Sequence, residues 1–415
     1  MVTDMPVALV TPLDDPFGLF EPAIFDDPYP IYHMLRHADP IHWCAPIQSW
    51  LLTRYDDANS VLSDRRFASG ARRAAATNQM PLELRQRMMP IDDFISQWLM
   101  NMDPPQHLRR RVPLNKLFSK PVVDRIAAEI QRVADQLIDR MLRAGGGDFI
   151  EDFAQPFPVA VIAAMVGIPP QDHARLFTWF SRMTAYFELG AARPEILDGM
   201  TATIAEMSDY FDALLDLRRR IPEDDVLTRL LALEEPPFGR EWTRATLALL
   251  LFAGHESTRA TIGNGMLALL ARPDTMERLR KDPCLLDRAI EEMLRFDGPF
   301  MRLDRVASAD VDMRGQRITS GDRVVLILGA ANRDPARFPQ PDVFDIDRAD
   351  IDHLAFGHGE HFCLGARLAR MELATGFEAL LRQLPQPRLS GDVVWRRHFN
   401  HRGLRRMPLG VGARI

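Results

Sequence analysis

The sequence predicts a mainly α-helical protein with small β-sheets, and three observations along its 415 residues support this fold class. Long stretches place apolar residues at three- and four-residue spacing, which is the pattern of helices that bury one face. Shorter runs, rich in aromatic and β-branched residues and bounded by turn residues, are typical of strands. Neither an internal repeat nor a glycine-rich phosphate loop after a strand occurs, which disfavours a repeat fold and a nucleotide-binding fold.

Length and composition favour one large domain that spans residues 1–415. By length alone the chain predicts two or three domains, yet no low-complexity or charge-block linker divides it. Hydrophobic residues make up 47% of the chain and charged residues 26%, so it holds enough apolar side chains for a large core. Only residues 1–17 are expected to be poorly ordered, as an N-terminal segment.

Charge and cysteine content exclude several classes of partner and site. The net charge of -6 disfavours a nucleic-acid binder, which needs a basic excess to neutralise phosphates. No run approaches the roughly 20 apolar residues of a membrane span, and the N-terminus lacks the features of a signal peptide. Cys44, Cys284 and Cys363 form no CxxC pair and predict neither a disulfide framework nor a zinc site. We therefore expect a cytoplasmic monomer without nucleic-acid or membrane partners.

Four stretches predict the main elements in chain order. Residues 40–54 hold two short β-like runs around a proline-containing turn and predict a hairpin. Residues 122–147 show helical spacing that ends at three glycines. Trp242–Ala271 predicts one helix of about 45 Å, which is apolar nearly all round in its first half and therefore buried. Residues 311–334 alternate and turn at glycines like a small sheet, and a proline-rich irregular segment follows.

The stretch FGHGEHFCLGARLARME, residues 356–372, places Cys363 just before a helical pattern. Backbone N–H groups and the dipole at a helix N-terminus favour a thiolate, and glycines allow the backbone to approach a bulky partner closely. These features suit a metal-bound thiolate. From the residues alone two other readings stay open: a small core residue, or a hydrolase nucleophile with His358 or His361 as its base.

The spaced residues around this cysteine resemble the haem-binding loop of the cytochrome P450 family. They are Phe356, Gly357, Gly359, His361, Cys363 and Gly365. The resemblance extends, through motifs in the family's order, from about residue 18 to the C-terminus. It implies the cytochrome P450 fold, with haem b (iron protoporphyrin IX) between the long central helix and the cysteine loop, and Cys363 as the thiolate ligand of the iron.

The sequence AGHES, residues 253–257, interrupts the apolar run of the long helix. Polar atoms in a buried helix are costly unless partnered, and a side-chain-to-backbone bond or a water cluster would explain them structurally. The resemblance implies instead that Ala253 and Gly254 leave room for O2 and that Glu256 and Ser257 deliver protons to it. Ser257 stands where the family usually has threonine; it keeps the donor and acceptor capacity but lacks the branch that restricts rotation.

Further charged residues match positions at which the family binds the two haem propionates, which need cations close by. These residues are His107, Arg111, Arg305 and His361. Glu292 and Arg295 lie three residues apart and therefore on one helix face, and the resemblance makes them the family's buried structural pair. Arg348 is the candidate for the third member of that pair.

Basic residues on two predicted helices form a candidate docking surface for an acidic electron donor, with solvated surface charge as the alternative. They are Arg109, Arg110, Lys116, Lys120, Arg367 and Arg370. No flavin or iron–sulfur domain is recognisable in the chain, so the electrons are expected from a separate ferredoxin and ferredoxin reductase.

The resemblance places the substrate pocket among stretches rich in Met, Phe and Trp, namely residues 88–100, 177–189 and 300–303, with Phe252 and Ala253. This composition predicts a small, mainly apolar organic substrate such as a terpenoid, steroid-like, fatty-acid or polyketide molecule, although the same pattern also suits a plain core. Arg302 would pair either with a substrate carboxylate or with Asp304.

The function that the resemblance implies is a soluble, bacterial-type haem-thiolate monooxygenase. It would insert one oxygen atom of O2 into a C–H bond of its substrate, in bacterial secondary metabolism or catabolism, with two external electrons and two protons. The alternative is a non-enzymatic haem-based sensor or carrier. A sensor or carrier would not need the acid and alcohol at Glu256 and Ser257.

Overall fold

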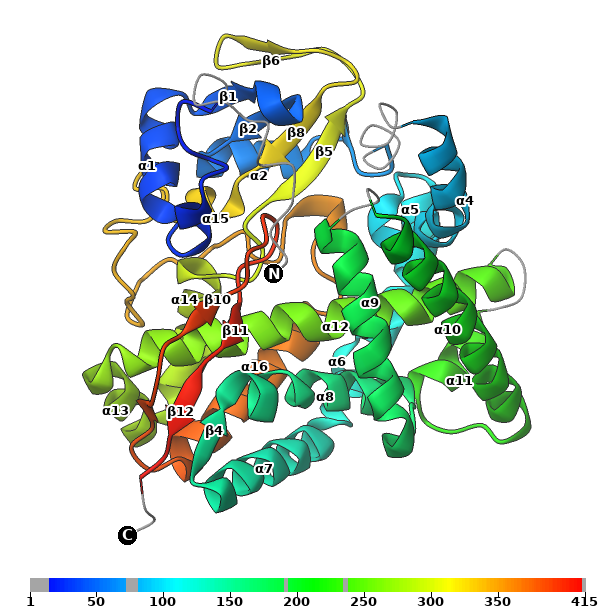
Figure 1. Ribbon diagram of the computed structural model, residues 1–415, viewed down its shortest axis with the longest axis vertical. Coiled ribbons are helices and arrows are strands. Elements are labelled where there is room, and N and C mark those ends of the chain that lie inside the picture. The colour runs from blue at the N-terminus through cyan, green and yellow to red at the C-terminus, as the bar shows by residue number, and fades with distance from the viewer. Residues whose placement is uncertain (1–14, 72–80, 190–192, 234–237, 413–415) are drawn as a thin grey trace. The chain divides into compact units, whose positions relative to one another are not determined.

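The computed structural model describes residues 15–71, 81–189, 193–233 and 238–412. Helices dominate these ranges, and the strands form four small sheets (Figure 1). The fold class expected from the sequence is therefore confirmed. Within the same ranges, no helix combines the length and the apolar composition that crossing a membrane requires.

Backbone contacts divide the chain into two compact units that are interleaved along the sequence. The first unit contains Met1–Ala68, Ile130–Phe157 and Ser257–Ile415, and the second contains Ser69–Glu129 and Pro158–Glu256. That residues 1–415 form one domain stays a prediction. The poor order expected for residues 1–17 falls almost entirely on residues outside the described ranges.

A five-stranded sheet forms the centre of the first unit, in the order β1-β2-β8-β5-β3. The strands are β1 (Ile41–Cys44), β2 (Ser49–Leu52), β3 (Phe67–Ala68), β5 (Leu303–Ala307) and β8 (Arg323–Leu326). β1 and β2 pair antiparallel around the short helix η3 (Ala45–Ile47), which confirms the predicted hairpin. β2 then pairs parallel with β8, although the two strands are far apart in sequence.

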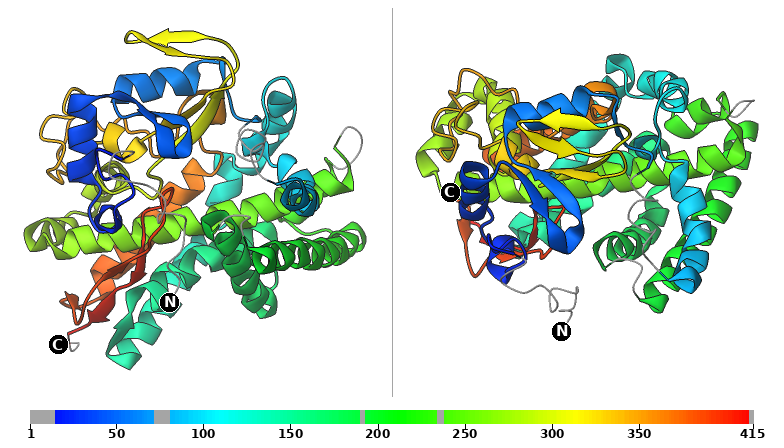
Figure 2. Two further views of the ribbon diagram at one scale, coloured as in Figure 1. Left: turned by 45° about the horizontal axis from the view of Figure 1, so that its top comes forward. Right: turned by 90° about the horizontal axis from the view of Figure 1, so that it is seen from above.

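The two faces of this sheet bury different clusters of side chains, because successive residues of a strand point to opposite sides. Val324 belongs to a cluster that includes residues of α2 (Tyr55–Ser63). Its neighbour Val325 belongs to a cluster that includes residues of α1 (Tyr29–Ala38). The α1 and α2 faces of the sheet are therefore distinct, and the hairpin of β6 (Val311–Met313) and β7 (Gln316–Ile318) projects beyond them (Figure 2).

Short helices, longer helices and two further small sheets complete the first unit. They are η2 (Pro22–Phe25), η5 (Ile150–Ala154), η7 (Pro283–Leu285), η8 (Gly359–His361), α13 (Pro273–Lys281), α14 (Leu286–Phe296), α15 (Leu328–Ala331), α16 (Ala366–Gln383), the strands β4 (Gly146–Asp148), β12 (Pro408–Gly410) and β9 (Arg388–Leu389) of one sheet, and β10 (Val394–Trp395) and β11 (Leu404–Arg406) of the other.

The second unit is helical throughout its described residues. Its elements are α4 (Leu82–Ser96), η4 (Leu99–Asn101), α5 (Gln106–Leu117), α6 (Lys120–Asp124), α8 (Pro156–Val166), η6 (Pro170–Asp172), α9 (His173–Leu189), α10 (Pro194–Arg220) and α11 (Val226–Leu231). The single helix predicted over residues 122–147 is wrong at its start, because α6 ends at Asp124 and α7 (Ala127–Ala144) begins after a turn. That turn is closed by an i to i+3 hydrogen bond from Ile126 N to Val123 O, at 3.2 Å.

The longest helix, α12 (Gly239–Leu270), confirms the helix predicted over residues 242–271. Its residues up to Glu256 belong to the second unit and the rest to the first. Within the first unit, glycines bring α12 close to its neighbours: a Cβ at Gly265 would lie 2.7 Å from Met293 Sδ of α14 and 2.9 Å from Phe377 of α16. Interiors packed this tightly leave no room for an added methyl group.

Candidate active site

Cys363 lies in the short turn between η8 and α16. Its backbone N–H donates to Phe356 O at 2.9 Å, and its carbonyl accepts from Ala366 N at 3.4 Å, so the residue is fixed at the entry to the helix. The predicted position at a helix N-terminus is confirmed, and this position favours a thiolate. Cys363 is partly exposed, whereas Cys44 is buried and Cys284 is exposed.

Glycines give the cysteine loop its shape and leave space beside it. Gly357 and Gly359 both have φ of 69°, in the left-handed region that strains residues with a side chain. A Cβ at Gly359 would also lie 2.6 Å from the carbonyl oxygen of Leu62 in α2. At Gly365, two residues after the thiol, a Cβ would have no described atom within 4 Å. The loop is thus packed on one side and open next to the cysteine, as a large flat ligand requires.

A clamp of three residues holds Phe356, the residue whose carbonyl accepts the Cys363 N–H. The Arg370 guanidinium carbon lies 4.5 Å from the centre of the Phe356 ring, and the His353 ring lies 5.9 Å from it. The third residue of the clamp is Glu291, whose carboxylate contacts the other two. It accepts two hydrogen bonds from Arg370, at 2.6 and 2.8 Å, and lies 3.3 Å from His353 Nε2.

The charge of Glu291 is stabilised by this clamp. Burial raises the pKa of Glu291, but the hydrogen bond from Arg370 and the approach of His353 outweigh burial and lower the pKa to about 2. Neither Glu291 nor His353 could be predicted from the sequence, because their partners lie 79 and 62 residues away and no local spacing signals the contact. Arg370, which the sequence placed in the candidate docking surface, is half-buried, and its guanidinium is bound to Glu291.

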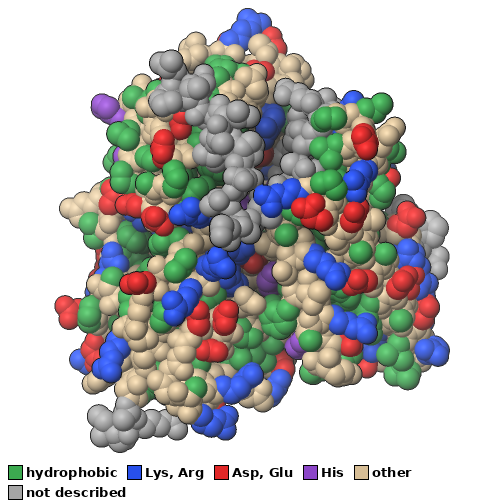
Figure 3. All heavy atoms as spheres, in the orientation of Figure 1, with side chains coloured by type: hydrophobic (Ala, Val, Ile, Leu, Met, Phe, Trp, Pro, Cys, Tyr) green, Lys and Arg blue, Asp and Glu red, His purple; other side chains and the backbone are tan. Residues whose placement is uncertain are grey.

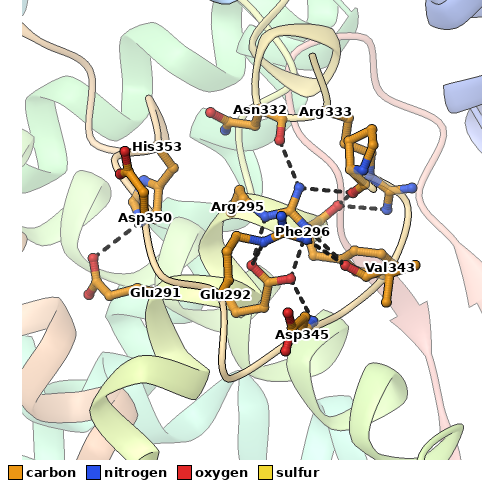
Figure 4. A network of polar contacts seen from close by, with 12 residues as sticks. Glu291, Glu292, Arg295, Phe296, Asn332, Arg333, Val343, Asp345, Asp350 and His353 are labelled. Atoms are coloured by element: carbon orange, nitrogen blue, oxygen red, sulfur yellow. Dashed lines mark hydrogen bonds and ion pairs between the residues drawn. The ribbon is translucent and has the colours of Figure 1, made fainter. Parts of the chain in front are cut away.

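The predicted structural pair on α14 is confirmed and is fully buried. Arg295 donates to Glu292 at 2.7 and 2.8 Å, and both side chains have no exposed surface (Figure 4). Arg348 Nε approaches Glu292 Oε2 at 3.3 Å, which confirms the proposed third member. Glu292 also accepts the N–H of Asp345 at 2.8 Å. The network therefore ties α14 to the irregular segment that precedes the cysteine loop.

The AGHES segment lies in the middle of α12. A Cβ at Gly254 would lie 2.8 Å from the Ile162 side chain of α8, so helix packing alone accounts for the glycine. The ring of His255 stacks on Phe180 at 3.9 Å, and its Nε2 lies 3.5 Å from Glu256 Oε2. The role of His255 as the neighbour of this carboxylate was not predicted from the sequence.

The polar residues of this segment are accompanied by an exposed alanine. Ala253 is exposed, although it lies within an otherwise apolar run of α12. Ser257 and Glu256 are both half-buried, whereas their neighbour Thr258 is buried. The backbone carbonyl of Ser257 accepts a hydrogen bond from Thr261 Oγ1 at 2.9 Å.

Aromatic side chains from the predicted pocket stretches come together in the second unit. Trp98 lies 5.8 Å from Phe187 and 6.2 Å from Phe252, and Phe187 lies 5.3 Å from Phe252, as measured between ring centres. Trp98 is 2% exposed, and its Nε1 has no hydrogen-bond partner among the described residues. A buried N–H without a partner costs about 1–3 kcal/mol, so this donor suits a ligand with an acceptor atom.

The four candidate propionate residues occur two in each unit. Arg305 on β5 is buried and donates to Asp304 O at 2.8 Å, and His361 ends η8 two residues before the cysteine. His107 is buried in the first turn of α5, and Arg111 lies one turn later and donates to Asn115 Oδ1 at 3.0 Å.

Several residues of the expected basic surface are bound to other residues of the chain. Arg110 donates to Gln97 Oε1 at 2.9 Å and stacks over Trp242, and Lys120 pairs with Asp124 at 2.5 Å. The residues that stay exposed are Arg109 and Lys116 on α5, Lys120 on α6 and Arg367 on α16. Within the described ranges, no group of three or more His, Cys, Asp or Glu residues is arranged to hold a metal ion.

Comparison with known proteins gives one consistent result. The family model "Cytochrome P450" matches residues 284–386. The chain is 35% identical over 395 residues to the cytochrome P450 monooxygenase PikC of Streptomyces venezuelae, covering 92% of this chain and 91% of the relative. It is 34% identical to the vitamin D(3) 25-hydroxylase of Pseudonocardia autotrophica, covering 98% of this chain and 100% of the relative.

Solved structures agree with these relatives. CalO2 superposes with a TM-score of 0.87 at 33% identity, covering 95% of this chain and 98% of that one. The myxobacterial cytochrome P450 CYP267B1, solved with myristic acid, superposes with a TM-score of 0.86 at 37% identity, covering 95% of this chain and 99% of that one.

Proposed function

The chain belongs to the cytochrome P450 family, and from that premise we propose that it oxidises a small, mainly apolar molecule, with electrons from a separate ferredoxin and ferredoxin reductase. Membership makes it a monooxygenase with haem, iron protoporphyrin IX, as its cofactor. The observation that carries the proposal is the turn at Cys363, which presents one thiol at the start of α16 beside the open space at Gly365.

We assign Cys363 as the iron ligand, with Phe356 and Gly365 beside the macrocycle. The helix N-terminus stabilises the thiolate, and the hydrogen bond from Cys363 N to Phe356 O holds the turn. Arg305, His361, His107 and Arg111 are the residues assigned to the propionates, as cations or as N–H donors. When bound, haem supplies the reduction of O2 and the transfer of one oxygen atom to the substrate.

We assign proton delivery to the middle of α12. The Glu256 carboxylate lies 3.5 Å from His255 Nε2, so a proton can be held between them, and the neighbouring Ser257 hydroxyl can both donate and accept. Ala253 is small and exposed, so the helix surface is open at this point, and Gly254 is the second small residue that we assign there, although Ile162 packs against it. Ser257 in place of the family's usual threonine turns more freely, which would loosen control of the proton.

The proposed substrate is apolar, with at least one acceptor atom. Trp98, Phe187 and Phe252 offer an aromatic surface, and Trp98 Nε1 offers a donor that no described residue satisfies. Relatives of the chain are named for vitamin D(3) and for polyketide biosynthesis. Molecules of these classes, together with fatty acids, fit such a surface, and bacterial secondary metabolism is the proposed setting.

The proposed electron donor would dock on α5. Leu108, Arg109, Val112 and Lys116 are exposed. Val112 follows Leu108 by four residues and Arg109 by three, and Lys116 follows Val112 by four, so all of them share one helix face. Apolar residues flanked by cations suit a small acidic redox protein. On the described part of the face in Figure 3, basic and acidic side chains are interspersed rather than gathered by sign. We propose a monomer that acts in the cytoplasm.

The experiment that tests the function compares three cysteine variants produced with an ample haem supply. We expect Cys363→Ala to lose the strongly red-shifted Soret band of the reduced carbon monoxide complex, because that band requires thiolate ligation. Cys44→Ala and Cys284→Ala are the matched controls and should keep it. An unchanged band in Cys363→Ala would refute the ligand assignment. Oxygen-dependent product from a surrogate ferredoxin system distinguishes an enzyme from a haem sensor or carrier.

A further inference from the structure

A hollow that is open to solvent lies in the first unit. We call it the arginine pocket and define it by Phe25, Tyr32, Arg302, Phe399 and Arg402. Its described lining comprises three arginines, two histidines and several aromatic or aliphatic side chains, and it includes no carboxylate. A hollow lined by cations and apolar groups has the composition of a site for an organic anion.

The arginine pocket lies on the α1 face of the five-stranded sheet. Two of its lining residues, Met301 and Tyr32, belong to the cluster buried on that face. The cysteine loop meets the other face: Gly359 abuts Leu62 of α2, and Leu303 packs with the α2 cluster. The pocket is therefore a different site from the cysteine loop.

Arg402 forms a wall of this pocket and is fully committed to structural contacts. It donates to Asp297 Oδ1 at 2.5 Å and to the carbonyls of Phe25 and Asp26 at 3.1 Å each. Its guanidinium carbon lies 3.7 Å from the centre of the Trp395 ring. These bonds fix the loop that ends at Arg402 against the N-terminal segment, so this wall is preformed.

Arg302 differs, because its charge has no hydrogen-bonding partner among the described residues. Its buried Nε makes no hydrogen bond. The nearby carboxylate of Asp304, which the sequence offered as a partner, lies instead 3.5 Å from Arg323. The Arg302 guanidinium carbon lies 4.8 Å from the centre of the Phe399 ring, which orients the planar group. The Arg302 residue is half-buried, and burial lowers the pKa of its guanidinium.

A partly desolvated cation without a hydrogen-bond partner is costly, and a bound anion would offset that cost. A guanidinium binds a carboxylate through two parallel hydrogen bonds, and a desolvated pair of this kind is among the stronger polar contacts. Phe25 and Phe399, which pack edge to face with ring centres 5.0 Å apart, offer an apolar surface next to the charge. A free phosphate would gain nothing from that surface.

We propose that the arginine pocket binds a small organic carboxylate, with the carboxylate on Arg302 and the apolar body against Phe25 and Phe399. The proposal concerns a site on the α1 face and does not depend on the function proposed above. It predicts an affinity that needs both the negative charge and the apolar body of the ligand.

The test uses 4-fluorophenylacetate as the probe and follows its fluorine NMR signal with the full-length, haem-loaded protein. We expect the signal to broaden with wild-type protein, and the affinity to fall at least about tenfold in Arg302→Gln, the effect of losing about 1.4 kcal/mol. Arg302→Lys keeps the charge without the planar fork and should fall in between. Arg317→Gln, which removes an equal charge from an exposed pair with Asp310, is the matched control and should bind as wild type does.

Two further probes decide the ligand class. The amide of the same acid has its shape without its charge, and we expect it to bind at least about tenfold more weakly. Unfluorinated phenylacetate should displace the probe, and inorganic phosphate at equal concentration should not. Equal binding of the amide, or equal displacement by phosphate, would overturn the proposal.

The Soret band of the same samples locates the bound probe. Binding at the arginine pocket should leave the band unchanged. A shifted band, together with full affinity in Arg302→Gln, would place the probe at the haem and overturn the proposal. Loss of the carbon monoxide band in a cysteine variant bears only on the function proposed above, so the two failures are distinguishable.

Discussion

Two glutamates of the first unit are equally buried on helices that pack against each other, yet their surroundings are opposite. Glu292 of α14 has no exposed surface and meets Arg295 and Arg348. Glu372 of α16 is 1% exposed, and its Oε2 has no hydrogen-bond partner among the described residues. Burial raises the pKa of Glu372 well above its usual value of 4.5. Burial by itself therefore does not fix the role of a carboxylate; the cations around it do.

Removal of the satisfied carboxylate should have the largest effect. Glu292→Ala leaves two buried guanidinium groups without their acceptor, so we expect a loss of about 3–5 kcal/mol in the free energy of unfolding, measured by chemical denaturation. Glu277→Ala on the exposed surface of α13 is the control and should change stability by less than about 0.5 kcal/mol. A loss below about 1 kcal/mol in Glu292→Ala would remove the contrast between the two glutamates.

Trp98 extends the contrast to the second unit, because its buried N–H is unsatisfied among the described residues. Trp98→Ala should cost about 3 kcal/mol in the free energy of unfolding, since it empties a large buried volume. Trp98→Phe should cost much less, because it removes a donor that bonds to nothing in the described structure. Equal losses in the two variants, measured by chemical denaturation, would mean that the N–H is satisfied after all.

Glu372 predicts a pH dependence of definite sign. Because the pKa of Glu372 is raised in the folded state, the folded state keeps a proton that the unfolded state releases above about pH 4.5. The contribution of the protonated side chain to the free energy of unfolding is therefore lost as the pH rises. We expect Glu372→Gln to become more stable relative to wild type as the pH rises, and to match it below pH 4.5. Parallel stability curves for the two proteins from pH 4 to pH 9 would contradict the raised pKa.

Substitution of Glu291, next to Glu292 in sequence, should have the smallest effect on stability. Its pH dependence should be opposite in sign to that of Glu372. Burial of Glu291 is outweighed by its bonds to Arg370 and His353, which lower its pKa to about 2. Its contribution is therefore present above the unfolded value of 4.5 and is lost as the pH falls towards 2. We expect Glu291→Gln to cost about 1 kcal/mol at neutral pH, since the carboxylate is partly solvated.

A spectroscopic readout shows whether Glu291 positions the cysteine loop as well as stabilising it. The Soret band of the reduced carbon monoxide complex should shift or broaden in Glu291→Gln, because the clamp on Phe356 is loosened. Arg278→Gln removes an exposed pair with Asp347 in the same unit and should leave the band unchanged. An unaltered band in Glu291→Gln would reduce the clamp to a structural contact.

The elements that the sequence predicted share a local signal. The hairpin at residues 40–54, the helix α12 and the turn before α16 each follow from side-chain periodicity or turn residues within one segment. The break between α6 and α7 has no such signal, because residues 122–144 keep helical spacing across it. Its cause is a turn that only the folded chain reveals.

The site residues that could be predicted also had a local signal, and those that could not had none. Cys363 could be identified because its glycines and its helix are adjacent in sequence, and Glu292 with Arg295 because they lie one helical turn apart. His255 beside Glu256 and Glu291 beneath Arg370 could not, because their roles depend on neighbours brought together by packing. Of the two alternatives for Arg302, the pair with Asp304 is not formed for a related reason, since Arg323 from the neighbouring strand lies 3.5 Å from that carboxylate.

The sequence by itself determined the helical class, the hairpin, the long helix and the cysteine at a helix start, because periodicity, turn chemistry and spacing act over a few residues. Only the tertiary structure decided the contacts between distant segments, such as those of Glu291 with Arg370 and of Glu292 with Arg348, since no local spacing signals them. Spacing within α14 already pairs Glu292 with Arg295, whereas Thr375 and Gly376 stand three and four residues after Glu372 in α16. The folded structure adds Arg348 to Glu292, where the segment up to Arg348 folds against α14, and brings no cation to Glu372 among the described residues.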